Sequence, residues 1–391
     1  MTSSGPEGGN PFEGLPMFGD LARMFSQQGP VNWDVARQTA MWLASDGQPE
    51  PNVDPLERIR LEELVRVADL HVSQQTGLNT SIAGGVLSVL PVTRRDWALH
   101  SIEAYRPFLE RLATSLSSAA ADAEAGPDAT VQLLGDLGKL LGPVLLGMQS
   151  GFMVGHLARR ALGQYDLPLP RLAADQLLVV PANIDAFAEQ WSMEPDDLRM
   201  WVCLQEVTHH AVLGRPHVRA RLEELINEYV SRFEVDPAAL EASLGDIDPT
   251  DMAGLQAVLG NPETLLGAVR SAGQQETLGR IETLTAVIEG YVDHVLDTAG
   301  RGIISSYGQI TEALRRRRVE ADDGERFAGR LLGLELNRGQ YERGATFVRG
   351  VAERAGDDGL ARLWHSEREL PTPAELDAPG LWLARIDLPE D

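Results

Sequence analysis

The segment Cys203-Leu204-Gln205-Glu206-Val207-Thr208-His209-His210 places polar side chains inside one of the most apolar stretches of the chain. This stretch begins at Pro195, followed by two acids, and ends before Gly214, a pattern typical of a helix start and a helix stop. Because apolar residues surround most of its circumference, we expect this helix to be buried. The carboxyl group of Glu206 would then enter the interior, where an unpaired charge is strongly unfavourable, so a partner is expected.

The spacing of Glu206 and His209 matches the H-E-x-x-H motif of zinc metallopeptidases, but Gln205 occupies the place of the first histidine. In the intact motif, histidines four residues apart lie about 40° apart around the helix and bind one zinc ion, while the glutamate activates a water molecule. Gln205 offers zinc only a neutral amide oxygen. His210 points about 100° away from His209 and cannot easily replace the missing ligand.

A second segment, residues 281–297, has apolar residues at spacings of three and four, which predicts a helix that faces the core. Glu289 and Asp293 are one turn apart on this helix and share a face. His294 is turned aside from Glu289, and we retain as an alternative that it hydrogen-bonds a substrate or Glu206.

Further landmarks extend along nearly the whole chain, from about residue 29 onward. They are GPVNWD at 29–34, GQYD at 163–166, LLVVPAN at 177–183, DDLRMW at 196–201, QEVTH at 205–209, EGYVDHV at 289–295, RRRR at 315–318, LLGLEL at 331–336, LWH at 363–365 and LPT at 370–372. In this order they resemble the actinobacterial zincin-like family, whose members are called zinc-dependent metallopeptidases or hydrolases. The resemblance implies a mainly α (α+β) fold: a zincin-like helical domain with a small sheet beside the motif helix.

The resemblance also implies roles for the site residues. In zinc peptidases whose third ligand is a glutamate, that ligand lies on a later helix, and an acid four residues further on supports the first histidine. By this likeness His209 and Glu289 are the expected zinc ligands and Glu206 the expected general base. Asp293 becomes a supporting residue that accepts a hydrogen bond from the amide of Gln205. The sequence resembles the branch of the family that lacks the first histidine.

Three functions are compatible with these residues. A zinc-dependent hydrolase would have only two firm ligands, although catalytic zinc normally has three protein ligands, so we expect its activity to be weakened or lost. The alternative is a metal-free pseudo-peptidase that keeps the polar residues as a buried network and binds a peptide or protein partner. In a third interpretation the polar cluster is structural only, and the protein acts in an assembly through its N-terminal arm.

Composition narrows the class of partner and the compartment. The chain has 58 acids against 34 Lys and Arg and a formal net charge of −24, which disfavours nucleic acid and anionic membranes as partners. A single cysteine, Cys203, excludes an intrachain disulfide and is typical of a reducing compartment. We expect Cys203 to be a core residue rather than a nucleophile. No secretion signal is visible, so the cytoplasm is the expected location.

The chain divides into a short arm, residues 1–28, and a body, residues 29–391, with a further boundary near 120–130. The arm begins with a Gly/Ser/Pro-rich stretch that we expect to be disordered, followed by a short amphipathic helix. Residues 140–158 are long and apolar enough to raise the question of a membrane span. Their interior polar residues and their glycines at 147, 151 and 155 favour close packing in a soluble core.

Two shorter segments carry alternatives. Residues 177–181 form the best strand candidate, either an edge strand that pairs with a substrate backbone or a plain buried strand. Residues 315–318 are four arginines followed by acids, which favours a solvated helix end with charge pairing over an anion site.

Overall fold

The structure is a computed structural model that describes residues 29–123, 129–171, 174–232, 272–320 and 323–389. The predicted N-terminal arm therefore lies outside the described residues, as do residues 124–128 of the predicted boundary near 120–130. The described chain is mainly α with one small parallel sheet, as the sequence predicts.

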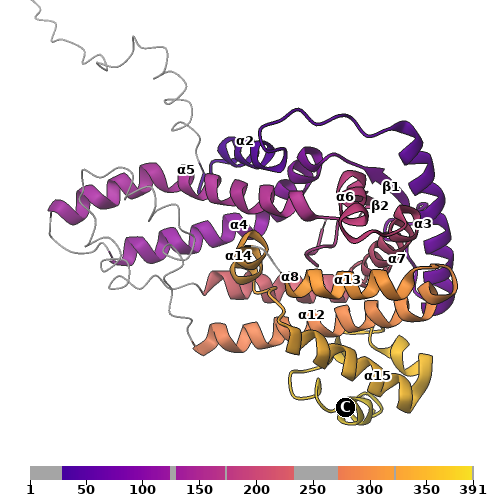
Figure 1. Cartoon of the computed structure of the whole chain (residues 1–391). Coiled ribbons are helices and arrows are strands. Elements are labelled where there is room, and N and C mark those ends of the chain that lie inside the picture. Colours follow the sequence, from indigo (N-terminus) through magenta and orange to yellow (C-terminus); the bar gives the residue numbers. More distant parts are fainter. Residues whose placement is uncertain (1–28, 124–128, 172–173, 233–271, 321–322, 390–391) are drawn as a thin grey trace, which may run out of the picture.

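The first half of the chain forms a bundle of three mutually packed helices, at the upper left of Figure 1: α2 (Trp33–Ala44), α4 (Arg94–Ala123) and α5 (Ala129–Arg160). Asn32 begins α2 because its side chain accepts a hydrogen bond from the Val35 amide at 3.1 Å. The glycines of α5 allow α2 to approach closely. A Cβ at position 147, 151 or 155 would lie 2.3, 2.6 or 2.8 Å from an atom of the Asn32–α2 segment. The predicted close packing is confirmed, and no helix within the described residues could cross a membrane.

The sheet pairs β1 (Ser88–Pro91) with β2 (Gln176–Val179) in parallel, with Val89 opposite Leu177. The other edge of β2 is also covered. Val179 forms an antiparallel bridge with Gly163, and the amide of Val180 donates to the carbonyl of Leu162 at 3.0 Å. The structure therefore favours a plain buried strand over an open edge that could pair with a substrate.

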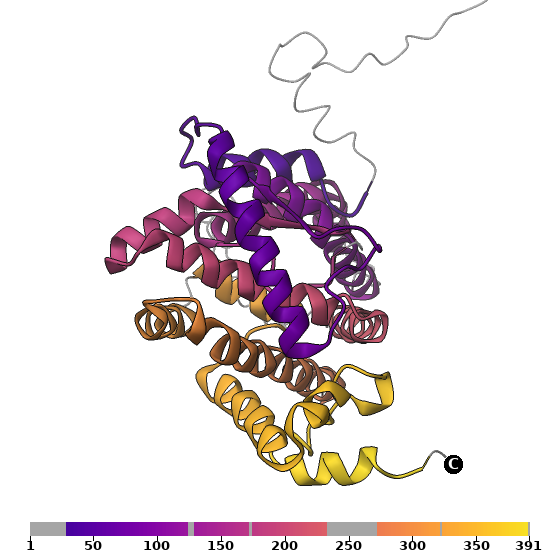
Figure 2. The ribbon, with the colours of Figure 1, turned by 90° about the vertical axis from the view of Figure 1, so that its right-hand side faces the viewer.

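Four further helices are α7 (Pro195–Leu213) and three that pack on it, α3 (Pro55–Thr76), α6 (Pro181–Trp191) and α8 (Pro216–Ser231). Asp54 caps α3 by accepting a hydrogen bond from the Leu56 amide, and Gly77 ends it in the left-handed conformation. In Figure 2, α3 crosses the front of the molecule, where it packs on α7. With α3 on one side and α12 on another, α7 is buried along most of its length.

The last part of the chain is built around α12 (Ala272–Ala299), which packs on α7, α8 and α15. It is followed by the short 3-10 turn η1 (Gly300–Gly302), α13 (Tyr307–Val319), α14 (Asp323–Leu332), α15 (Arg338–Arg362), the 3-10 turn η2 (Glu367–Glu369) and α16 (Pro379–Ile386). A capping box between Asn337 and Gln340 fixes the start of α15. The two helices that sequence analysis singles out, α7 and α12, therefore lie side by side.

Candidate active site

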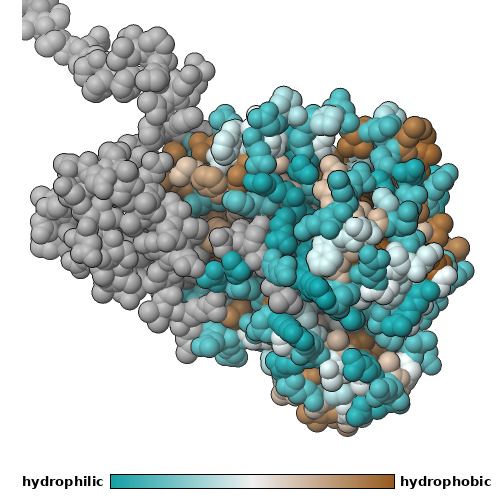
Figure 3. All heavy atoms as spheres, in the orientation of Figure 1, coloured by the Kyte–Doolittle hydropathy of each residue, from teal (hydrophilic) through white to brown (hydrophobic). Residues whose placement is uncertain are grey.

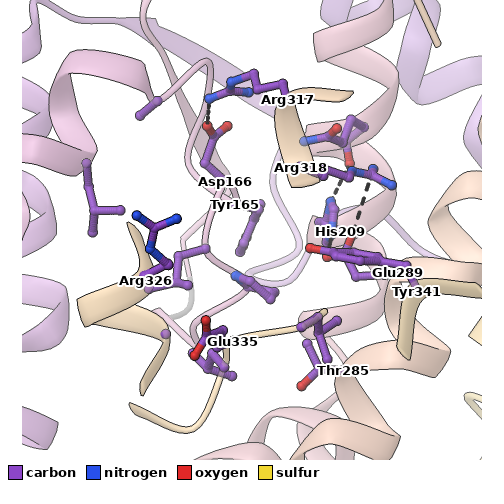
Figure 4. Close-up of a pocket in the computed structure, with 18 of the residues that line it drawn as sticks. Tyr165, Asp166, His209, Thr285, Glu289, Arg317, Arg318, Arg326, Glu335 and Tyr341 are labelled. Carbon is purple, nitrogen blue, oxygen red and sulfur yellow. Dashed lines mark hydrogen bonds and ion pairs between the residues drawn. The ribbon is translucent and has the colours of Figure 1, made fainter. Parts of the chain in front are cut away.

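A cavity of about 130 Å³ lies among α7, α12, α13 and the loop that follows α5. Three of the residues predicted from the sequence line it together: Gln205 and His209 from α7 and Glu289 from α12. Figure 4 shows His209, Glu289 and Arg318 on one side of the cavity and Arg326 on the other. Segments far apart in the sequence therefore meet at one point, as the family resemblance implies.

His209 and Glu289 bind each other inside this cavity. The Nε2 atom of His209 lies 2.9 Å from Oε1 of Glu289, and its Nδ1 lies 3.1 Å from the backbone carbonyl oxygen of Gln205. Both acceptors are oxygens, so both ring nitrogens donate and the ring is an imidazolium. Burial opposes this charge, but the Glu289 carboxylate outweighs burial and raises the pKa of His209. Burial would likewise raise the pKa of Glu289, but His209 and then Arg318 hold it below its usual value.

Arg318 is a further partner of Glu289 and also binds Asp293. The sequence did not indicate that this arginine belongs to the site. Its Nη1 donates to both carboxylate oxygens of Asp293, at 2.9 and 3.0 Å, and its Nη2 lies 3.7 Å from Oε2 of Glu289. Its guanidinium lies over the ring of Tyr341, 5.5 Å from the centroid. Within the described residues, the predicted hydrogen bond from Gln205 to Asp293 is not formed. Asp293 is bound by Arg318 instead, because a cation is a stronger partner for a carboxylate than a neutral amide.

The arginine run at residues 315–318 is thus only partly a solvated helix end. Arg317 is 15% exposed and pairs with Asp166 at 2.6 Å, and Arg318 is 19% exposed. Arg316 pairs within its own helix, with Glu312 at 2.8 Å. The prediction of a solvated end is wrong for Arg317 and Arg318, since successive helical residues point about 100° apart and these two point inward.

Glu206 is fully buried and is not among the residues that line the cavity. Its Oε2 accepts hydrogen bonds from the backbone amides of Gln164, at 2.7 Å, and Tyr165, at 3.0 Å. Its Oε1 is buried with no hydrogen-bond partner among the described residues. Burial raises the pKa of Glu206 to about 8 despite these two amides. The sequence predicts that the carboxyl group of Glu206 has a partner in the interior, and that partner is the backbone of a loop.

That loop, residues 163–166, holds the site together, although its role could not be inferred from its chemistry. Gly163 must lack a side chain, because a Cβ there would lie 2.3 Å from Cδ of Glu206. Asp166 fixes the turn, because its carboxylate accepts hydrogen bonds from the Leu162 and Gly163 amides at 3.1 and 3.3 Å. The same carboxylate accepts a hydrogen bond from Arg317 at 2.6 Å. The signal in the sequence is that GQYD is one of the landmarks that carry the family resemblance.

The remaining polar residues near the motif lie outside the cavity lining. His210 pairs through Nδ1 with the Tyr165 hydroxyl at 3.0 Å, and burial lowers the pKa of His210 to about 4. His294 is half-buried, and no hydrogen bond joins it to Glu206 in the part of the chain that the structure describes. Cys203 is fully buried and burial raises the pKa of its thiol, which agrees with a core residue.

The donor set does not fit a resident zinc ion. A catalytic zinc needs three protein ligands and an open position. Among the described residues, no group of three or more His, Cys, Asp or Glu side chains could hold a metal. The two predicted ligands, His209 and Glu289, meet in the cavity with Nε2 2.9 Å from Oε1, which is one protein ligand short of a catalytic site. The guanidinium of Arg318 already supplies a positive charge beside Glu289, at the position where a bound metal ion would supply one.

Comparison with known proteins identifies the family. A sequence model described as zincin-like metallopeptidase matches residues 31–383, so the chain belongs to this family. A crystal structure from Chloroflexus aurantiacus, titled as a "putative hydrolase with a novel fold", superposes with a TM-score of 0.64 at 24% sequence identity. The match covers 92% of this chain and 100% of the other, and at that identity it shows a shared fold. No curated protein sequence matches this chain significantly.

Proposed function

We propose that this chain is a metal-free member of the zincin-like metallopeptidase family that binds a peptide or protein partner beside the cavity. The observation that carries this proposal is the position of Arg318. Its guanidinium is bound to Asp293 and lies 3.7 Å from Glu289, the two acids that a zinc site would use. A fixed organic cation therefore supplies the positive charge that these carboxylates require, and it would repel a divalent ion.

The placement of Glu206 also supports a role other than hydrolysis. A general base must reach the proton that it abstracts, within hydrogen-bond distance or through one water molecule. Glu206 instead accepts hydrogen bonds from two backbone amides of the loop, and it is not among the residues that line the cavity. Its role here is to fix that loop against α7.

The size of the cavity indicates where a partner would bind. A volume of about 130 Å³ is below the range of about 300–1,000 Å³ that is usual for ligand pockets. A peptide is far larger, so its backbone would lie at the opening and at most a small side chain would enter. We therefore expect the partner to contact the helices around the cavity rather than to occupy it.

Metal analysis of untagged protein tests the proposal directly. We expect essentially no zinc in the natural chain, and none in Gln205→His alone, because Arg318 remains in place. The double variant Gln205→His/Arg318→Met should bind about one zinc per chain, with a zinc-dependent rise in melting temperature. Gln205→His/Arg315→Met is the matched control, since it removes an arginine of the same helix that does not touch Glu289.

The second candidate is a zinc-dependent hydrolase that uses His209, Glu289 and Glu206, and membership of the family favours it. It predicts about one zinc per natural chain and a peptidase activity that Glu206→Gln abolishes. That pair of results would overturn the metal-free proposal.

A further inference from the structure

A groove of about 700 Å³ lies between α13 and α15, next to the cavity. Its lining carries five arginines and four acids, so its balance is positive in a chain whose net charge is −24. In Figure 1, α12 lies between these two helices, and Asp293 of α12 is part of the lining. Hydrophilic residues gather over α13 on the face shown in Figure 3. The groove is within the size range of ligand sites, about 300–1,000 Å³.

Two of the five arginines have no partner in the part of the chain that the structure describes. Arg316, Arg318 and Arg338 pair at 2.8–2.9 Å with Glu312, Asp293 and Glu342, respectively, which are lining acids. Arg315 of α13 and Arg349 of α15 form no ion pair and no hydrogen bond with any described residue, and both are exposed. The fourth lining acid, Glu320, forms no ion pair among these residues either. The unpaired charge of the groove is thus two guanidinium groups against one carboxylate.

We infer that this groove binds an acidic peptide segment whose carboxylates contact Arg315 and Arg349. This inference rests on the proposed function, since it names the partner of the same site. At physiological salt, charges more than about 8 Å away are largely screened, so the arginines of the groove outweigh the distant acids of the chain. A guanidinium fork matches a carboxylate geometrically and can bind it through two parallel hydrogen bonds.

The groove and the cavity share a wall. Arg318 and Tyr341 line both, with the guanidinium of Arg318 over the Tyr341 ring. A carboxylate bound in the groove therefore lies beside the cation that pairs with Asp293 and Glu289. A peptide in the groove would therefore lie at the opening of the cavity, where the small volume of the cavity places a partner.

The groove is also held in shape before any partner binds. Gly344 of α15 lies against α12 so closely that a Cβ on it would be 1.9 Å from the carbonyl oxygen of Ala286. The backbone of Gly290 meets the same segment of α15. Because α15 is fixed on α12, little ordering of the helices accompanies binding, which favours affinity.

The test is fluorescence anisotropy of a labelled peptide of Glu and Gly, with a Gln and Gly peptide of equal length as the neutral probe. We expect binding of the acidic peptide, weakened by added salt, and little binding of the neutral one. Arg315→Gln/Arg349→Gln should weaken binding about five- to tenfold, the loss expected for two exposed ion pairs. The matched control is Arg66→Gln/Arg111→Gln, which removes the same charge from exposed positions on α3 and α4.

Equal weakening in both double variants would overturn the inference, because the effect would then come from net charge. Unchanged peptide binding in the groove variant, Arg315→Gln/Arg349→Gln, would also overturn the inference. A labelled single-stranded oligonucleotide of equal charge that binds as tightly, with the same loss in the groove variant, would show a general anion site and overturn the assignment to peptide. Metal analysis is independent of these results: zinc in a protein that still binds the peptide through Arg315 and Arg349 overturns the metal-free function and leaves the groove standing.

Discussion

Replacing Glu206 by Gln should change how the stability of the protein depends on pH. The substitution keeps the shape of the side chain and an oxygen that can accept the Gln164 and Tyr165 amides, and it removes the ionisable group. Burial raises the pKa of Glu206 from 4.5 to about 8. The group therefore ionises near pH 4.5 in the unfolded chain and only near pH 8 in the folded one.

The sign and size of the effect follow from this difference. The contribution of Glu206 to stability is fully present below about pH 4.5 and is lost as the pH rises to about 8, because the unfolded chain then releases a proton that the folded chain keeps. At about 1.4 kcal/mol per pH unit, an interval of roughly 3.5 units corresponds to about 5 kcal/mol. At every pH the variant also carries a buried amide nitrogen in place of the unpaired Oε1, which costs about 1–3 kcal/mol.

The variant should thus be less stable than the natural protein near pH 5 and more stable near pH 8.5. Urea unfolding followed by circular dichroism at fixed pH values across this range gives the difference in unfolding free energy directly. All other titrating groups are present in both proteins and largely cancel in the difference. Glu63→Gln, on the exposed side of α3, is the control, and its difference should stay within about 0.5 kcal/mol at every pH. A constant difference between the Glu206→Gln variant and the natural protein would refute the reasoning, since Glu206 would then have the same pKa in both states.

Two further predictions concern packing around the motif helix. Gly163→Ala should destabilise the protein by about 1–3 kcal/mol or more, measured by urea unfolding, because its Cβ would lie 2.3 Å from Cδ of Glu206; a change below about 0.5 kcal/mol would mean that the loop does not press on Glu206. Cys203 should resist alkylation by iodoacetamide at neutral pH in the folded protein and react after unfolding, because its thiol is fully buried and burial raises its pKa. Mass spectrometry gives both readings, and rapid labelling of the folded chain would contradict the core assignment.

Local chemistry in the sequence was enough to place the motif helix. Pro195 and Gly214 bound α7 as predicted, because helix start and stop signals depend on residues next to each other in the chain. The apolar periodicity of 281–297 correctly predicted that this helix faces the core, since the pattern repeats with the helical turn. The family resemblance implied that His209 and Glu289 share a site, and the structure brings both to one cavity.

The partners of these side chains were decided by tertiary structure alone. Periodicity tells which face of a helix is buried, but it does not tell which of several distant groups reaches a given carboxylate. Asp293 pairs with an arginine 25 residues away and Asp166 with one 151 residues away. The run at 315–318 looked solvated because its acidic neighbours in sequence suggested local pairing. Once α13 lies across the site, Arg317 and Arg318 are largely desolvated and each binds a nearby half-buried acid, because an unpaired charge inside the protein is too unfavourable to persist.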